Sequence, residues 1–209
     1  MSLTPHITPY WQDACAVLSK NDPILARIIR DSAPNKQLIS YQNPFYTFSK
    51  IIIGQQISVH AANAIFRRFE QAVDHSITAK RFLETSKEII LATGFSKPKY
   101  RYLHIIAELI CKSCFFEDYK ALEDVSDKTQ KLLSIVGVGQ WSADMFLIFH
   151  DLEPDICPLG DVGLVNAIKK YYQVQSNDDI LKVCEPWHPY STVATWFLWS
   201  AIDDEIVQY

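Results

Sequence analysis

The stretch LLSIVGVGQWSA, Leu132–Ala143, is the part of the sequence that decides its interpretation. An apolar helix ends at the Gly-x-Gly turn Gly137-Val138-Gly139, and a second helix begins directly after it. The first amides of that helix have no intrahelical acceptor, and the positive end of the helix dipole lies behind them. A turn of this kind is suited to binding a phosphate. A plain helical corner with a glycine C-cap explains the pattern equally well.

Asp161 is the carboxylate that follows this stretch, after a turn marked by Pro158 and Gly160. Considered alone, it is a good N-cap for the next helix, and capping is the favoured interpretation. A helix N-terminus also stabilises negative charge, which suits a carboxylate that stabilises a developing sugar cation or orients a water molecule. Both roles are compatible, because one oxygen can cap while the other faces a substrate.

The composition sets limits on the class of protein. With 209 residues, 48% of them hydrophobic, the chain forms one large domain or two small lobes. A formal net charge of −4 requires any nucleic-acid role to rest on a local patch. Five cysteines, an odd number, do not form a secreted disulfide framework. No apolar run approaches eighteen residues and no signal peptide is present, so we expect no membrane association and a cytoplasmic location, or a nuclear one in a eukaryote.

Periodicity and capping residues predict an all-α protein. Residues 34–42 and 151–160 are expected to be loops, and a small strand at either terminus is left open. The predicted helices cover residues 10–20, 23–30, 44–53, 58–68, 78–91 (as one or two helices), 96–113, 126–137, 139–150, 161–172, 178–184 and 189–202, with Ser126 as the cap of the helix before the glycine turn.

Several polar and aromatic residues allow both a structural and a functional interpretation. Trp141 and Trp199 can fill a core or stack on bases, cationic bases above all. Gln55 and Gln56 can satisfy a tight turn or enter a base stack. The local basic groups are solvated helix faces unless they fold to one side, where they would follow a phosphate backbone; they are Lys97, Lys99 and Arg101, with Arg67 and Arg68.

Four segments give the chain a resemblance to the helix–hairpin–helix DNA glycosylase superfamily, and within it to the 3-methyladenine DNA glycosylase II branch. They are residues 51–58 (IIIGQQIS), 94–99 (GFSKPK), Leu132–Ala143 together with Asp161, and 187–191 (WHPYS). The resemblance extends from about residue 40 to residue 202, and the combination of segments is more specific than any one of them.

The resemblance implies one catalytic unit, 1–209, of two helical lobes with a DNA-binding cleft between them. The central lobe would cover about 40–157 and hold the helix–hairpin–helix at about 126–150. The terminal lobe would combine about 1–39 with about 158–209. The partner would be double-stranded DNA with a damaged base, bound by a monomer and flipped into the cleft.

The resemblance also implies the roles of individual residues. Asp161 would be the catalytic acid, and Trp141, Met145 and Trp199 would line the base pocket. The residues implied to bind DNA are Gly137, Val138 and Gly139 at the hairpin, Gln55 and Gln56 at the gap left by the flipped base, and Lys97 and Lys99. A structural Na⁺ or K⁺ ion would bind the backbone carbonyls of Leu133, Ile135 and Val138.

One departure from the family pattern bears on mechanism. Trp141 stands where relatives that also nick the backbone place a nucleophilic lysine, which predicts a monofunctional hydrolase without lyase activity. The four-cysteine iron–sulfur cluster of some relatives is missing, and no cofactor is expected to be required. The expected reaction is hydrolysis of the N-glycosidic bond of alkylated purines, such as 3-methyladenine and 7-methylguanine, in base excision repair. The alternatives are a glycosylase for a deaminated or oxidised base and a non-enzymatic DNA-binding or damage-sensing protein.

Overall fold

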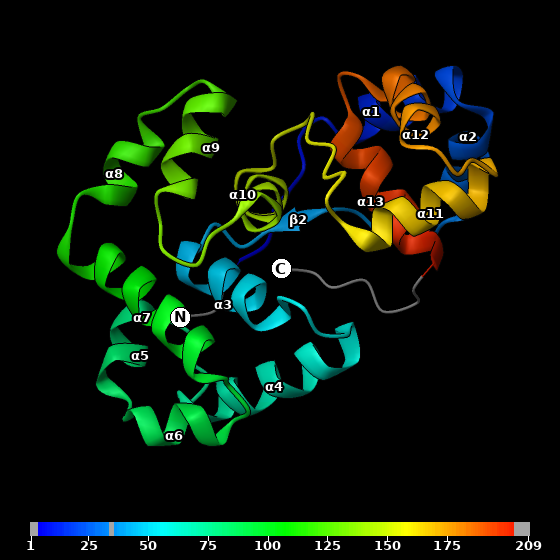
Figure 1. Ribbon diagram of the computed structural model, residues 1–209. Coiled ribbons are helices and arrows are strands. Elements are labelled where there is room, and N and C mark those ends of the chain that lie inside the picture. Colours follow the sequence, from blue (N-terminus) through cyan, green and yellow to red (C-terminus); the bar gives the residue numbers. More distant parts are fainter. Residues whose placement is uncertain (1–3, 34–35, 203–209) are drawn as a thin grey trace. The chain divides into compact units, whose positions relative to one another are not determined.

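The computed structural model describes residues 4–33 and 36–202, and α-helices dominate this part of the chain (Figure 1). The all-α prediction is confirmed. The helices are accompanied by one short antiparallel pair, in which β1 (His6–Ile7) pairs with β2 (Ile39–Ser40) and His6 lies opposite Ser40. The predicted loop 34–42 therefore contains a strand, while its residues 34–35 lie outside the described part.

The chain divides into two compact units. Among the described residues, unit 1 comprises Thr4 and the segment Tyr41–Phe146, and unit 2 combines Pro5–Ser40 with residues 147–202. The second boundary was expected near residue 157. It falls after Phe146 because the π-helical turn Leu147–Asp151 packs on β2, where the Ser40 hydroxyl donates to the His150 carbonyl at 2.7 Å.

Unit 1 is built around α3 and α7, which pack on each other. Its apolar interior includes the stacked rings of Phe48 and Phe146, whose centroids are 4.4 Å apart. The helices of this unit are α3 (Pro44–Gly54), α4 (Val59–Ala72), α5 (Ala79–Glu84), α6 (Lys87–Ala92), α7 (Lys97–Lys112), α8 (Phe115–Lys120), α9 (Val125–Leu133) and α10 (Gln140–Phe146).

Helix starts in unit 1 follow the side chains that cap them. Ser58 accepts from the Ala61 amide and Ser96 from the Lys99 amide, as their positions in the sequence predict. The predicted cap Ser126 is wrong. Asp124 caps α9 instead, because its Oδ1 accepts from the amides of Ser126 (2.8 Å) and Asp127 (3.1 Å). Helix α8 was not predicted.

Unit 2 is centred on α13 (Ser191–Ile202), which contacts α1, α2 and α11 and is buried from Ser191 to Leu198. Asp22 joins three of its elements. Oδ1 caps α2, and Oδ2 accepts from the Tyr172 hydroxyl (2.5 Å) and from Nε1 of Trp187 (3.0 Å). The other elements are α1 (Trp11–Asn21), α2 (Pro23–Asp31), α11 (Val162–Tyr172), α12 (Asn177–Cys184) and the 3₁₀ turn Glu185–Trp187.

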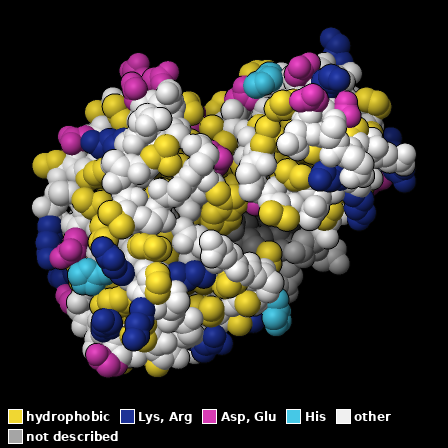
Figure 2. All heavy atoms as spheres, in the orientation of Figure 1, with side chains coloured by type: hydrophobic (Ala, Val, Ile, Leu, Met, Phe, Trp, Pro, Cys, Tyr) yellow, Lys and Arg dark blue, Asp and Glu magenta, His cyan; other side chains and the backbone are white. Residues whose placement is uncertain are grey.

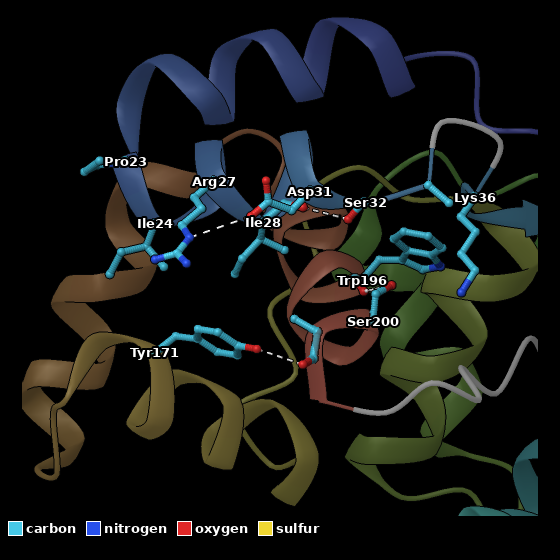
Figure 3. A pocket seen from close by; sticks show the side chains of 12 residues that line it. Pro23, Ile24, Arg27, Ile28, Asp31, Ser32, Lys36, Tyr171, Trp196 and Ser200 are labelled. Carbon is cyan, nitrogen blue, oxygen red and sulfur yellow. Dashed lines mark hydrogen bonds and ion pairs between the residues drawn. The ribbon is translucent and has the colours of Figure 1, made fainter.

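A pocket of about 710 Å³ lies within unit 2, between α2, α11 and α13 (Figure 3). Arg27 and Asp31 form an ion pair on its wall (3.7 Å), and the Tyr171 hydroxyl donates to the Ala201 carbonyl (2.7 Å). The pocket contains none of the predicted site residues. In the part of the chain that is described, no helix has both the length and the apolar character needed to cross a membrane.

Candidate functional site

The Gly-x-Gly turn joins α9 to α10 in unit 1 and forms the predicted hairpin. The Ile135 amide donates to the Leu132 carbonyl at 3.1 Å, and the Val138 amide donates to the Ile135 carbonyl at 3.0 Å. Ile135 and Val138 are buried as hinge contacts, whereas Val136 at the tip is 51% exposed. The turn thus has an apolar anchor on one side and an exposed edge on the other.

The two glycines of the hairpin have different roles. Gly137 has φ +92°, and a Cβ there would lie 2.2 Å from Cγ of Tyr102. Gly137 is therefore required by the fold, both for its backbone conformation and for the packing of Tyr102. A Cβ on Gly139 would meet no atom within 4 Å. The open side of the turn is thus at Gly139, next to the first amides of α10, where a phosphate can approach.

Gln55 holds the hairpin in place. Its Nε2 donates to the Gly137 carbonyl at 3.0 Å and to the Ser142 hydroxyl at 2.9 Å. These bonds commit the Gln55 amide to the protein, whereas the family resemblance implied that Gln55 contacts DNA. The next residue, Gln56, is exposed with φ +58°, and Ile57 beside it is 38% exposed. The exposed edge of this turn therefore consists of Gln56 and Ile57.

The predicted basic residues also differ from one another. Lys99 Nζ donates to the Ile53 carbonyl at the end of α3 (2.8 Å), and burial lowers the pKa of Lys99. Arg68 Nε donates to the Thr93 carbonyl (2.7 Å). Both side chains support the fold, whereas Lys97 is exposed at the start of α7. Figure 2 shows Lys and Arg side chains over the part of unit 1 where Figure 1 places α5, α6 and α7.

Trp141 and Met145 lie one helical turn apart on α10. Trp141 is half-buried, while Met145 is 1% exposed and belongs to the buried apolar residues. Of these two predicted pocket residues, only Trp141 is accessible to a ligand.

Asp161 caps α11 in unit 2 and receives a second bond from a tryptophan. Its Oδ1 accepts from the Leu164 amide at 2.7 Å and from Nε1 of Trp199 at 2.9 Å. The Trp199 ring is stacked on Phe149, with centroids 5.9 Å apart and planes 12° apart. Trp199 was predicted as a base-stacking residue, and in the structure its N–H and one ring face have partners within the protein.

Gly163 makes the bond between Trp199 and Asp161 possible, and the sequence interpretation missed it. A Cβ on Gly163 would lie 3.0 Å from Oδ1 of Asp161 and 3.6 Å from Nε1 of Trp199. The only signal in the sequence was a glycine in the first turn of a helix, which costs about 1 kcal/mol of helix propensity relative to alanine. Tyr102 and Ile57 carried no comparable signal.

Among residues 4–33 and 36–202, no group of three or more His, Cys, Asp or Glu side chains is arranged to hold a metal ion. At the hairpin, backbone amides donate to the carbonyls of Leu132 and Ile135. Within the described residues, the turn's hydrogen bonds do not involve the carbonyls of Leu133 and Val138. Leu133 is the last residue of α9, and the negative end of a helix dipole favours a cation nearby.

Comparisons with known proteins relate the chain to one family. The model of the HhH-GPD superfamily of base excision DNA repair proteins matches residues 49–189. The Schizosaccharomyces pombe alkylbase DNA glycosidase-like protein mag2 is 31% identical over 164 residues, covering 75% of this chain and 76% of mag2. DNA-3-methyladenine glycosylase 1 of the same yeast is 28% identical over 189 residues (87% and 82%). The solved structure of S. pombe 3-methyladenine DNA glycosylase (Mag1) with abasic DNA has a TM-score of 0.77 and 27% identity, covering 93% of this chain and 100% of Mag1.

Proposed function

Because the chain belongs to the HhH-GPD superfamily of base excision DNA repair proteins, we propose that it is a monofunctional DNA glycosylase that removes alkylated purines from duplex DNA. The observation that carries this proposal is the geometry of Asp161. Two N–H donors, the Leu164 amide and Nε1 of Trp199, hold its Oδ1 at the start of α11 and so fix the position of the carboxylate. The names of the relatives mag2 and DNA-3-methyladenine glycosylase 1 support the alkylated substrate.

Hydrolysis of an alkylated purine nucleotide mainly requires a negative charge placed next to the sugar. A purine such as 3-methyladenine or 7-methylguanine is cationic, so its glycosidic bond is already weakened and the leaving base needs no protonation. The sugar acquires positive charge as the bond breaks. The Asp161 carboxylate stabilises this charge and orients the water that attacks C1′. The products are the free base and an abasic site.

Extrusion of the base is assigned to groups of unit 1. Flipping costs a few kcal/mol, least for a damaged pair. The half-buried ring of Trp141 offers a stacking surface worth about 1–3 kcal/mol per base. Gln56 and Ile57 are the exposed residues of the turn that would occupy the gap in the duplex. Trp141 has no amine, so it cannot form the Schiff base that strand cleavage requires.

Backbone binding is assigned to the hairpin and to Lys97. The first amides of α10 beside Gly139 would hold one phosphate, and Lys97 at the start of α7 would contact another. The backbone carbonyls of Leu133, Ile135 and Val138 would hold a Na⁺ or K⁺ ion, which would supply positive charge near the phosphate. Damaged duplex DNA is the partner, and we propose that a monomer binds it.

The deciding experiment measures release of free base from duplexes that contain 7-methylguanine, hypoxanthine or 8-oxoguanine, with wild type and Asp161→Asn. We expect wild type to release the methylated base and to leave the DNA strand intact. Asn retains an oxygen for the Leu164 and Trp199 donors but lacks the charge, so release should fall at least about 100-fold. Affinity for abasic DNA should persist.

The alternatives predict other results. Release of only hypoxanthine or 8-oxoguanine would identify a glycosylase for another lesion. Binding of abasic DNA without release of any base would favour a non-enzymatic damage-sensing protein. An active Asp161→Asn variant would remove Asp161 from the mechanism.

A further inference from the structure

We propose that Asp155 is a positioning residue for Asp161: it fastens the segment that leads into Asp161 to α13, the helix that also carries Trp199. This inference rests on the proposed function of Asp161 and adds a second residue on which the placement of that carboxylate depends.

The Asp155 carboxylate is the centre of a cluster of hydrogen bonds at the start of α13. Its Oδ2 is bonded to Nδ1 of His188 at 2.5 Å. Its Oδ1 accepts from the Ser191 hydroxyl at 2.5 Å and from the Ser191 amide at 3.2 Å. Burial raises the pKa of Asp155, but the bonds from Ser191 and His188 together lower it, so the carboxylate is charged at neutral pH.

Thr192 secures the residues on both sides of Asp155. Its hydroxyl donates to the Glu153 carbonyl at 2.6 Å and accepts from the Ile156 amide at 3.0 Å. Its own amide donates to the Pro154 carbonyl at 3.1 Å. Residues 153–156 therefore all bond to the start of α13, where Thr192 is completely buried.

The path from this cluster to Asp161 is short and constrained. The Leu159 amide donates to the Cys157 carbonyl at 2.9 Å, and the Asp161 amide donates to the Pro158 carbonyl at 2.8 Å. These turns leave the segment between the two residues little freedom to absorb a shift of Asp155, so the shift would reach Asp161.

The C-terminal half of α13 also holds Asp161, through Trp199. Trp199 lies eight residues after Ser191, about 12 Å along the helix at about 1.5 Å per residue. Its Nε1 donates to Oδ1 of Asp161, and the residues between are buried. One rigid helix thus fixes the backbone before Asp161 through Asp155 and the carboxylate itself through Trp199.

Loss of the cluster should therefore affect the chemical step more than binding. A displacement of about 1 Å at a reacting group costs up to about 100-fold in rate. For Asp155→Ala we expect the single-turnover rate of 7-methylguanine release to fall about 10–100-fold, with affinity for duplex DNA containing a tetrahydrofuran abasic analogue within about twofold of wild type. Asp155→Asn retains an oxygen for Ser191 and should recover part of the rate.

A matched variant separates positioning from stability. Thr8→Val removes another buried hydrogen bond of unit 2, from the Thr8 hydroxyl to the Leu38 carbonyl (2.6 Å). It should lower the melting temperature, as Asp155→Ala does, but keep the wild-type rate at a temperature where all variants are folded. Equal rates in Asp155→Ala and wild type, or equal losses in Asp155→Ala and Thr8→Val, would overturn the inference.

Hydrogen exchange tests the inference independently of activity. In Asp155→Ala, the peptide that spans residues 157–164 should exchange faster, including the amides of Asp161 and Leu164, whereas in Thr8→Val it should exchange as in wild type. Unchanged exchange in Asp155→Ala would refute the positioning role. Faster exchange in that variant, combined with a wild type that releases no base from any duplex, would uphold the positioning of Asp161 and refute the proposed function instead.

Discussion

Gly163 lies in the first turn of α11, two residues after Asp161, where a side chain would compete with the bond between Asp161 and Trp199. An alanine methyl group would lie 3.0 Å from the Asp161 oxygen and 3.6 Å from the indole nitrogen. The bond at 2.9 Å can then persist only if the carboxylate or the ring shifts by a few tenths of an ångström. Helix propensity acts in the opposite direction and favours alanine by about 1 kcal/mol.

We therefore expect Gly163→Ala to separate stability from activity. The melting temperature should stay the same or rise, while single-turnover base release should fall about tenfold because the carboxylate is displaced. Gly160→Ala is the matched control, since its methyl group would meet no atom within 4 Å and should leave the rate within about threefold of wild type. A wild-type rate in Gly163→Ala would show that the Trp199 bond does not set the position of Asp161.

At the scale of elements, the helix starts could be predicted from the sequence, because they depend on interactions between residues close together in the chain. Asp22, Ser58, Ser96 and Asp161 each cap the helix that follows them, as N-cap propensities indicate. The cap of α9 was misplaced because Asp124 and Ser126 are both good capping residues two positions apart, and local pattern does not rank them.

The long-range contacts that arrange the site could not be predicted from local sequence patterns. Gln55 bonds to Gly137 across 82 residues, and β1 pairs with β2 so that His6 lies opposite Ser40. Trp199 bonds to Asp161 across 38 residues. Such partners depend on the packing of helices that are distant in the sequence. Local periodicity therefore found the helices and the candidate residues, but it did not tell which side chains support the fold and which face a ligand.

The hairpin provides a test at this scale, because its two glycines should respond differently to the same change. Gly137→Ala places a methyl group 2.2 Å from the Tyr102 ring at a left-handed φ, so we expect a loss of at least about 1–3 kcal/mol of stability. Gly139→Ala meets nothing within 4 Å and should preserve stability, but its methyl group would obstruct a phosphate at the first amides of α10. Urea unfolding and abasic-DNA titrations measure the two effects.

The expected result for Gly139→Ala is a wild-type unfolding midpoint with abasic-DNA affinity reduced about tenfold. Undiminished affinity would place the phosphate elsewhere. A large loss of stability in this variant would contradict the open space around Gly139.

At the scale of the whole molecule, a net charge of −4 limits how DNA can be held. Lys99 and Arg68 donate to backbone carbonyls of the protein, so these two cations are partly committed to the fold. The hairpin amides offer a neutral alternative, since aligned N–H groups bind phosphate without adding formal charge. We infer that the backbone dipoles of α10 contribute a large share of phosphate binding in this acidic chain.

Lys50 is a half-buried cation that makes this chain's stability depend on alkaline pH. It lies on α3 with Nζ 4.4 Å from the centroid of the Phe66 ring and 5.8 Å from that of Tyr46. Burial lowers its pKa to about 8, although the charge of Glu70 raises it in part. In the unfolded chain the pKa returns to about 10.4.

The sign of the effect follows from proton binding. Between pH 8 and about 10 the unfolded chain holds the Lys50 proton more tightly than the folded one, so the contribution of Lys50 to stability should rise with pH in this window. Below pH 8 both states are protonated, and the full cost of the buried charge, at most about 3 kcal/mol, is present. Burial raises the pKa of Tyr46, which makes stability fall with rising pH, but only above about pH 10, where the unfolded tyrosine begins to lose its proton.

Lys50→Met should therefore be more stable than wild type at pH 7, by about 1–2 kcal/mol once the lost cation–π contacts are subtracted. This advantage should shrink by pH 9.5, where the wild-type ammonium has largely deprotonated in the folded state. Urea unfolding of both proteins at the two pH values measures it, and Lys80→Met, a change at an exposed lysine, should show no such difference. A constant gap between Lys50→Met and wild type across this range would mean that Lys50 keeps its charge throughout and that its aromatic neighbours offset its burial.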